Sequence, residues 1–173
     1  FELLISGWLK AGIIAGVFLG TPCTTWSRAN RCPIRSSESP MGVPSLTAAQ
    51  QVRLQLGNDT FNFSCRIISL CKSLGVPCLL ENPQSSIMWS APRLVRLLSD
   101  DSCTSAVGHL CQFGAQWRKA TRIAGWHVSC LDCVDKKCCG QSRICSKSGK
   151  YHVVLSGAAP GGRKWTAIAA EYP

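Results

Sequence analysis

The sequence predicts one α/β domain with a mainly parallel, doubly wound sheet. Two short apolar runs, residues 13–19 and 76–80, are typical of buried strands, and each ends in a polar motif. Residues 45–74 lie between them and carry apolar side chains at helical spacing. A strand, helix, strand order favours parallel neighbours with covering helices. A chain of 173 residues can form one core and does not require two domains.

The remaining elements follow from the same kinds of pattern. Residues 28–44 are rich in Arg, Ser and Pro and indicate a polar, mobile loop. Gly57 is expected to kink or split the long helix, and Gly75 to cap its end. Further elements are expected as helices over residues 2–10, 93–98 and 165–170, and as strands over residues 107–111, 122–128 and 151–155.

Charge and hydropathy limit the classes of partner. The net charge of +10 favours a polyanion such as nucleic acid, although a solvated basic surface would also account for it. The apolar run at residues 12–19 is too short to cross a bilayer, so we expect no membrane partner. Twelve cysteines, several in expected helix and strand interiors, favour free thiols in a reducing compartment, the nucleus or the cytoplasm.

The first polar motif contains Cys23. It follows the first expected strand directly, in the turn from Gly20 to Arg28. In an open α/β sheet ligands bind at the carboxyl ends of the strands, and a cysteine held there on a tight turn has the placement that a nucleophile needs. A buried loop cysteine is the alternative interpretation.

The second polar motif is Glu81-Asn82-Pro83, at the end of the second expected strand. A carboxylate at the end of an apolar strand is costly to bury without a partner or a task. An apolar wall would raise its pKa, which suits a proton donor or a hydrogen bond to the edge of a base. A turn carboxylate before Asn-Pro is the alternative.

Together these motifs resemble the cytosine-C5 DNA methyltransferases. Pro22-Cys23 with Ser27 is similar to the family's nucleophile loop, and Glu81-Asn82 is similar to its Glu-Asn pair. The segment from Phe113 to Arg118 resembles the family's Phe-Gly-x-x-Gln-x-Arg motif with one residue missing. The resemblance implies part of a Rossmann-like methyltransferase sheet, with residues 1–128 as the catalytic part and residues 129–173 as a Cys-rich segment with a closing strand and helix.

The resemblance also implies a mechanism and a set of site residues. Cys23 would add to C6 of a flipped cytosine in DNA while Glu81 contacts the ring, so that C5 accepts a methyl group from S-adenosylmethionine. Cofactor contacts are expected from Thr21, Pro22 and Asn82. DNA contacts are expected from side chains near the two motifs and from two later arginines: Trp26, Ser27, Arg28, Arg31, Arg118 and Arg122.

The sequence contains no glycine-rich cofactor loop and no acidic ribose clamp before the first motif. We therefore expect that the cofactor-binding half is absent from this fragment, or that the domain does not bind the cofactor as it stands. Residues 26–28, 81–83, 119–122 and 152–157 and the final Ala-Ala-Glu-Tyr-Pro are also similar to methyltransferase-like domains of eukaryotic mobile elements such as retrotransposons. The alternative function is an inactive nucleic-acid-binding module from such an element, stabilised by zinc.

The Cys-rich segment predicts a second kind of site. Cys130-x-x-Cys133, Cys139 and His152 are the candidate ligands for a structural zinc ion. A loop of free thiols is the alternative.

Overall fold

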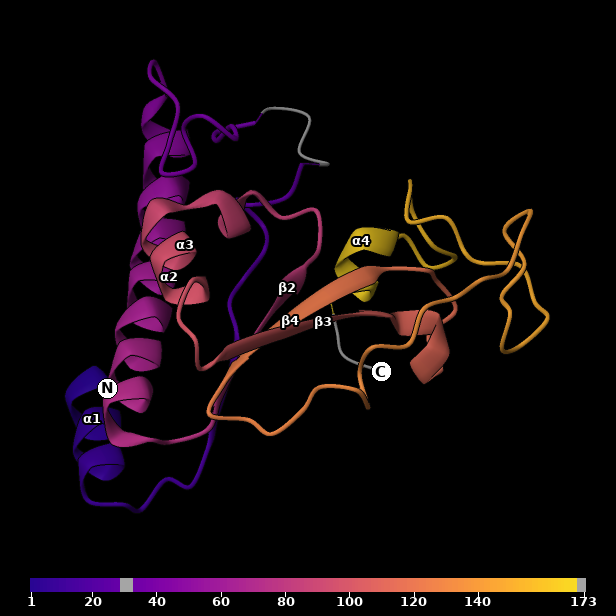
Figure 1. Cartoon of the computed structure of the whole chain (residues 1–173). Coiled ribbons are helices and arrows are strands. Elements are labelled where there is room, and N and C mark those ends of the chain that lie inside the picture. The colour runs from indigo at the N-terminus through magenta and orange to yellow at the C-terminus, as the bar shows by residue number, and fades with distance from the viewer. Residues whose placement is uncertain (29–32, 171–173) are drawn as a thin grey trace.

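The computed structural model describes residues 1–28 and 33–170, and a four-stranded mixed sheet organises them (Figure 1). The strands are β1 (Val17–Gly20), β2 (Cys78–Pro83), β3 (Cys103–His109) and β4 (Ala120–Trp126). Their order across the sheet is β1-β2-β4-β3. The α/β class is therefore as expected.

The parallel pair β1 and β2 is joined by the helix α2 (Ala48–Leu74). Thr47 and Gln50 form a reciprocal capping box at the start of α2. Gly75, with φ of 67°, caps its end in the left-handed conformation, as predicted. The helix is continuous through Gly57, so the alternative that Gly57 splits it is wrong.

Strand β4 makes most of the sheet antiparallel, which corrects the expectation of a mainly parallel sheet. It pairs antiparallel with β2 on one side and with β3 on the other. Only residues 110–119, including the short 3-10 helix η2 (Leu110–Phe113), connect β3 to β4. That connection returns the chain directly beside β3, whereas a parallel neighbour needs a crossover of a dozen residues or more. The strand expected at residues 107–111 begins earlier, at Cys103.

Three helices cover one face of the sheet (Figure 1). Helix α2 contacts β2 and β4, α1 (Glu2–Lys10) packs on α2, and α3 (Pro92–Leu98) contacts α2 and β3. The 3-10 helix η1 (Ile87–Ser90) leads into α3. The core between helices and sheet includes Trp26, Phe61, Ile68, Leu80 and Trp126. These residues come from α2, β2, β4 and the turn after β1, so one core holds the two parallel strands against α2.

An irregular segment after β4 packs on the opposite face. A Cβ on Gly125 would meet the side chains of Val128 and Leu131, and a Cβ on Gly108 would meet the backbone of Val134. In the described part of the chain this face therefore has a loop where a doubly wound fold has helices, so the doubly wound expectation is also wrong.

The rest of the Cys-rich region extends away from the sheet as loops (Figure 1). The edge strand expected over residues 151–155 is not formed: Tyr151 makes one isolated bridge, to Ile144. The short helix α4 (Trp165–Ile168) follows, within the span expected for the closing helix.

Candidate active site and metal centre

Cys23 lies three residues beyond the carboxyl end of β1, on a hydrogen-bonded turn. The Trp26 N–H donates to the Cys23 carbonyl at 3.0 Å, and the Cys23 side chain is partly exposed. The next strand supports the same turn, because the Asn82 amide donates to the Thr21 carbonyl at 2.6 Å. The turn is therefore fixed at both of its ends.

The side chain of Arg35 supports the turn that carries Cys23. Its guanidinium lies 3.5 Å from the centre of the Trp26 ring and donates to the Thr25 hydroxyl at 3.1 and 3.3 Å. It also donates to the Pro40 carbonyl and to Asn58 Oδ1, each at 2.7 Å, and to the backbone carbonyl of residue 54. Burial lowers the pKa of this arginine to about 10, so it still carries its charge at neutral pH. A buried cation thus links the Cys23 turn to α2.

Glu81 lies within β2, two residues before its carboxyl end, and its backbone pairs with Gly20 in the parallel register. Its side chain is 8% exposed and lines an apolar pocket of about 240 Å³ with Phe18, Leu110 and Phe113 among its walls. Cys23 therefore follows β1, whereas Glu81 belongs to the adjacent strand β2, near the same end of the sheet.

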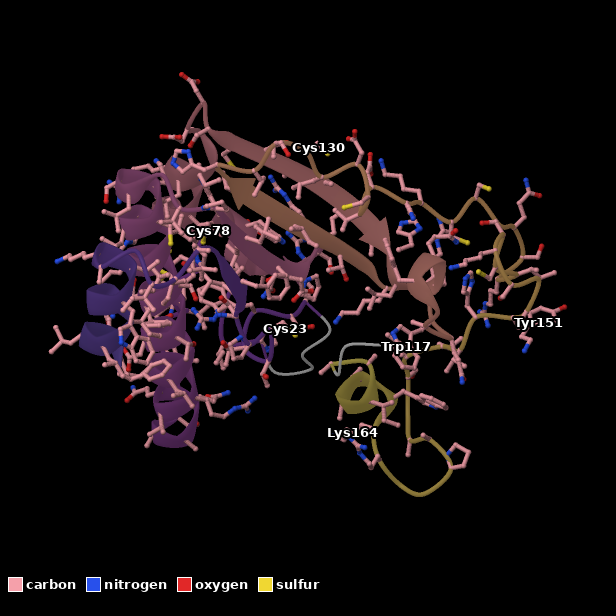
Figure 2. All side chains as sticks on the ribbon, turned by 90° about the horizontal axis from the view of Figure 1, so that it is seen from below. Cys23, Cys78, Trp117, Cys130, Tyr151 and Lys164 are labelled. Atoms are coloured by element: carbon pink, nitrogen blue, oxygen red, sulfur yellow. The ribbon has the colours of Figure 1, made fainter. Side chains whose placement is uncertain are left out.

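Cys23 and Glu81 nevertheless line different pockets. The Cys23 pocket has a volume of about 530 Å³ and is formed by the turn, by Arg53 of α2 and by residues of the α4 region, including Lys164. Figure 2 shows Cys23 on the side of the molecule that faces the segment bearing Lys164. Two cationic side chains beside a thiol suit an anionic ligand such as a phosphate group. Sequence reasoning missed both cations, because they come from segments distant from the motif.

The predicted DNA contacts near Cys23 have different positions. Ser27 lines the Cys23 pocket, and Arg28 is exposed and donates to the Ser37 hydroxyl. Arg31 lies outside the described residues. Trp26 is fully buried between Arg35 and Phe61, so the interpretation of Trp26 as a base-stacking residue is wrong and it is a core residue.

The two later arginines lie near β3 and β4. Arg118 is exposed and donates to His109 Nδ1 at 3.2 Å. Arg122 stacks on Trp89 at 4.7 Å and donates to the Ser105 hydroxyl at 3.3 Å. Neither lines the described pocket of Cys23 or of Glu81.

The residues predicted to bind S-adenosylmethionine serve the fold instead. The buried Thr21 hydroxyl is hydrogen-bonded to the Ser64 hydroxyl at 2.7 Å. The Asn82 amide nitrogen donates to the Thr21 carbonyl. Asn82 Oδ1 is buried without a partner, but the Asn82 side chain is fully enclosed. Pro22 is exposed beside Thr24 and Thr25. These side chains do not form a site for S-adenosylmethionine.

Four side chains could hold a metal ion at the far end of β3. The Sγ atoms of Cys111, Cys138 and Cys145 and a ring nitrogen of His152 all lie within 4.8 Å of one another. The three thiols are buried. Cys138 Sγ is 3.7 Å from His152 Nε2, which identifies Nε2 as the nitrogen that faces the sulfurs.

Hydrogen-bond donors surround the sulfurs of this group. Burial acts to raise the pKa of Cys138, but hydrogen bonds from Ser146 and from the backbone of Gly140 lower it to about 7. Backbone N–H groups of Ser148 and Lys147 lower the pKa of Cys145 to about 6. These hydrogen bonds favour the thiolate, the form that binds metal, at Cys138 and Cys145, whereas burial raises the pKa of Cys111 to about 11.

Only His152 among the predicted zinc ligands belongs to this group. Cys130, Cys133 and Cys139 are exposed, and Figure 2 shows Cys130 far from Tyr151, the neighbour of His152. The Cys-x-x-Cys spacing was a misleading local signal. The useful signal was the large number of Cys and His residues between positions 111 and 152, which includes Cys111, a residue that the sequence analysis assigned to a strand.

No helix in the described part of the chain is long and apolar enough to span a membrane. All eleven cysteines among the described residues are free thiols. Comparison with protein-family models, curated proteins and solved structures gave no match for this chain.

Proposed function

We propose that this domain is the nucleophile-bearing part of a DNA cytosine-C5 methyltransferase-like protein. The observation that supports this most directly is the parallel register of β1 and β2. It pairs Gly20, the last residue of β1, with Glu81 of β2, so that the Cys23 turn begins beside the strand residue that carries the carboxylate. Ligands of α/β sheets bind at such ends.

In this proposal Cys23 and Glu81 act on a pyrimidine that has left the DNA stack. The thiolate of Cys23 forms a bond to C6, the C5–C6 electron pair moves into the ring, and a proton from the Glu81 carboxyl neutralises N3. Since the two side chains line different pockets, the proposal requires DNA binding to join those pockets.

The partner is proposed to be DNA because of charge near the thiol as well as overall. Arg53 and Lys164 line the Cys23 pocket, and Arg28 is exposed close by in sequence. Together with the net charge of +10, these groups suit the phosphates on either side of a displaced base.

Covalent trapping tests the proposal directly. Duplex DNA with 2-pyrimidinone at cytosine positions is incubated with the chain, and intact mass spectrometry measures the protein–DNA adduct. This base accepts a thiol at C6 and does not need methyl transfer. We expect an adduct that Cys23→Ser abolishes and that Glu81→Gln slows, while Cys130→Ser, an exposed cysteine elsewhere, leaves it unchanged. The absence of an adduct, or an adduct at another cysteine, would contradict the proposal.

A second candidate is an inactive nucleic-acid-binding module stabilised by metal. Two observations favour it: Cys23 and Glu81 line different pockets, and the residues predicted to bind S-adenosylmethionine do not form a site for it. This candidate predicts DNA binding that weakens with salt and no adduct with the modified duplex. The same experiment therefore separates the two functions.

A further inference from the structure

Beyond Val134, which packs on the sheet, the Cys-rich segment has few sources of tertiary stability other than its thiols. Its buried apolar cluster consists of Cys111, Cys138 and Cys145 alone. In the described chain after β4, regular structure amounts to the four residues of α4 and two isolated bridges. Segments with so small a core are usually held by disulfides or by a metal ion. Since the described cysteines are free, a metal ion is the remaining cross-link.

We infer that Cys111, Cys138, Cys145 and His152 bind one zinc ion, and that this ion anchors the C-terminal arm, residues 153–170, over the Cys23 pocket. Neither part depends on the proposed reaction with cytosine. On binding, three Zn–S bonds and one Zn–N bond form while the three S–H bonds break and release their protons to solvent. The resulting site carries one net negative charge.

The distances suit tetrahedral zinc. Zn–S bonds of about 2.3 Å and a Zn–N bond of about 2.0 Å place S and N about 3.6 Å apart and two sulfurs about 3.8 Å apart. Cys138 Sγ is already 3.7 Å from His152 Nε2, and the whole group lies within 4.8 Å. The ligands therefore need to move by no more than about 1 Å to close the site.

The polar surroundings support thiolate ligands. The Ser146 N–H and hydroxyl donate to Cys138 Sγ at 3.4 and 3.5 Å, and Gln112 Nε2 lies 3.5 Å from Cys111 Sγ and 3.8 Å from Cys145 Sγ. Three soft sulfurs with one imidazole favour zinc over magnesium or calcium, which prefer oxygen ligands.

The ion would connect the arm to the sheet. Cys111 lies in η2, directly after β3, whereas His152 lies at the start of the arm. The next residue, Val153, donates its N–H to the Gln116 carbonyl at 2.8 Å. Near its other end the arm accepts a hydrogen bond from Lys119 Nζ, at the Ala169 carbonyl.

The arm then forms one wall of the Cys23 pocket. Lys164, Thr166, Ala167 and Ala170 face Cys23, Thr24 and Ser27 there. Its internal hydrogen bonds join residues that are close in sequence, as in the bridge between Ala158 and Lys164 and the Trp165 N–H bond to the Gly157 carbonyl, so they do not tie the arm to the sheet. Loss of the zinc anchor should therefore release this wall and expose the Cys23 thiol, while the sheet and its helices stay folded.

Metal content tests the ligand set. The full chain, purified with zinc, should contain one zinc per chain by elemental mass spectrometry, and cobalt substitution should give the intense visible bands of a tetrahedral site. Cys138→Ser should lose the metal, whereas its exposed neighbour Cys139→Ser, and the pair Cys130→Ser and Cys133→Ser, should retain it. A disulfide among Cys111, Cys138 and Cys145, or zinc lost from the exposed-cysteine variants instead, would overturn the assignment.

Thiol reactivity tests the anchor. Removal of zinc with a chelator should raise the alkylation rate of Cys23 several-fold, as measured by peptide mass spectrometry, and added zinc should restore it. The buried core thiol Cys71 is the internal control and should stay protected. An unchanged Cys23 rate would overturn the anchoring role. An equal increase in the alkylation rate of Cys71 would also overturn it, because the ion would then stabilise the whole fold and not the arm alone.

Discussion

Replacement of Arg35 by methionine tests whether the buried guanidinium holds the Cys23 turn to α2. Methionine keeps much of the apolar length of the side chain and removes every donor. The Pro40 carbonyl and Asn58 Oδ1 would each lose a 2.7 Å bond, the residue 54 carbonyl and the Thr25 hydroxyl would lose longer ones, and the stacking on Trp26 would disappear.

The size of the effect follows from those contacts. Each buried acceptor left unpaired costs about 1–3 kcal/mol, and the lost stacking costs about 0.5–2 kcal/mol. The losses are not additive, because the Thr25 hydroxyl can rotate and because the methionine adds apolar contact, so we expect about 3–5 kcal/mol. A domain of this size has about 5–15 kcal/mol of stability in total.

Urea unfolding at pH 7 measures this loss. Arg53→Met is the matched control, because Arg53 is an exposed arginine of α2, and it should change stability by no more than about 0.5 kcal/mol. The free energy of unfolding of Arg35→Lys should lie between those of the two methionine variants, since an ammonium keeps the charge but cannot reach all four acceptors. If Arg35→Met and Arg53→Met have the same free energy of unfolding, with the same dependence on urea concentration, the structural role assigned to Arg35 is incorrect.

Three further predictions concern the same framework. Gly57→Ala should destabilise the domain although alanine favours helix, because its Cβ would lie 2.4 Å from the Thr25 hydroxyl. Gly7→Ala in α1 has open space around its Cβ and should stabilise the domain by about 0.5–1 kcal/mol in the same urea experiment. Asn82→Asp should cost about 3 kcal/mol at pH 7, since a buried carboxylate would face the backbone carbonyl that now accepts the Asn82 amide; an effect below about 1 kcal/mol would contradict this. The Lys72 ammonium, with help from Ser102, lowers the pKa of Asp100 to about 2, so the stability that this carboxylate adds is complete above about pH 4 and is lost as the pH falls toward 2. The stability difference between the wild type and Asp100→Asn should therefore shrink over that range in acid titrations, and a difference that persists at pH 2 would count against it.

The sequence predicted those elements whose signals are local. Helix α1 and the Gly75 cap of α2 lie where periodicity and cap residues indicated, and both motif-bearing strands form. Strand direction was not predictable in the same way, because β4 owes its antiparallel placement to the length of one connection and not to its own residues. Local patterns determined the elements but not their pairing.

The loop before α2 shows the same limit at the level of side chains. Its composition indicated an exposed, mobile segment, yet Arg35 within it is 2% exposed. Apart from the Pro40 carbonyl, the partners of Arg35 are distant in sequence: Thr25 and the Trp26 ring on the Cys23 turn, and groups on α2. The signal that was present was Gly57, interpreted as a kink. The glycine is needed because Thr25 and Arg35 pack directly against the helix backbone there.

The two cross-links described above act on one pocket from different directions. Arg35 fixes the turn that carries Cys23 to α2, and the proposed zinc ion fixes the arm that forms the opposite wall. Among the described hydrogen bonds, the one from Lys119, just before β4, to the Ala169 carbonyl joins that wall to the sheet region. With so little support besides the metal site, the accessibility of Cys23 should depend on metal while the position of Cys23 should not. A chain in which Arg35→Met and chelation have the same effect on Cys23 alkylation would contradict this division. Distinct effects would mean that the turn and its cover are stabilised independently.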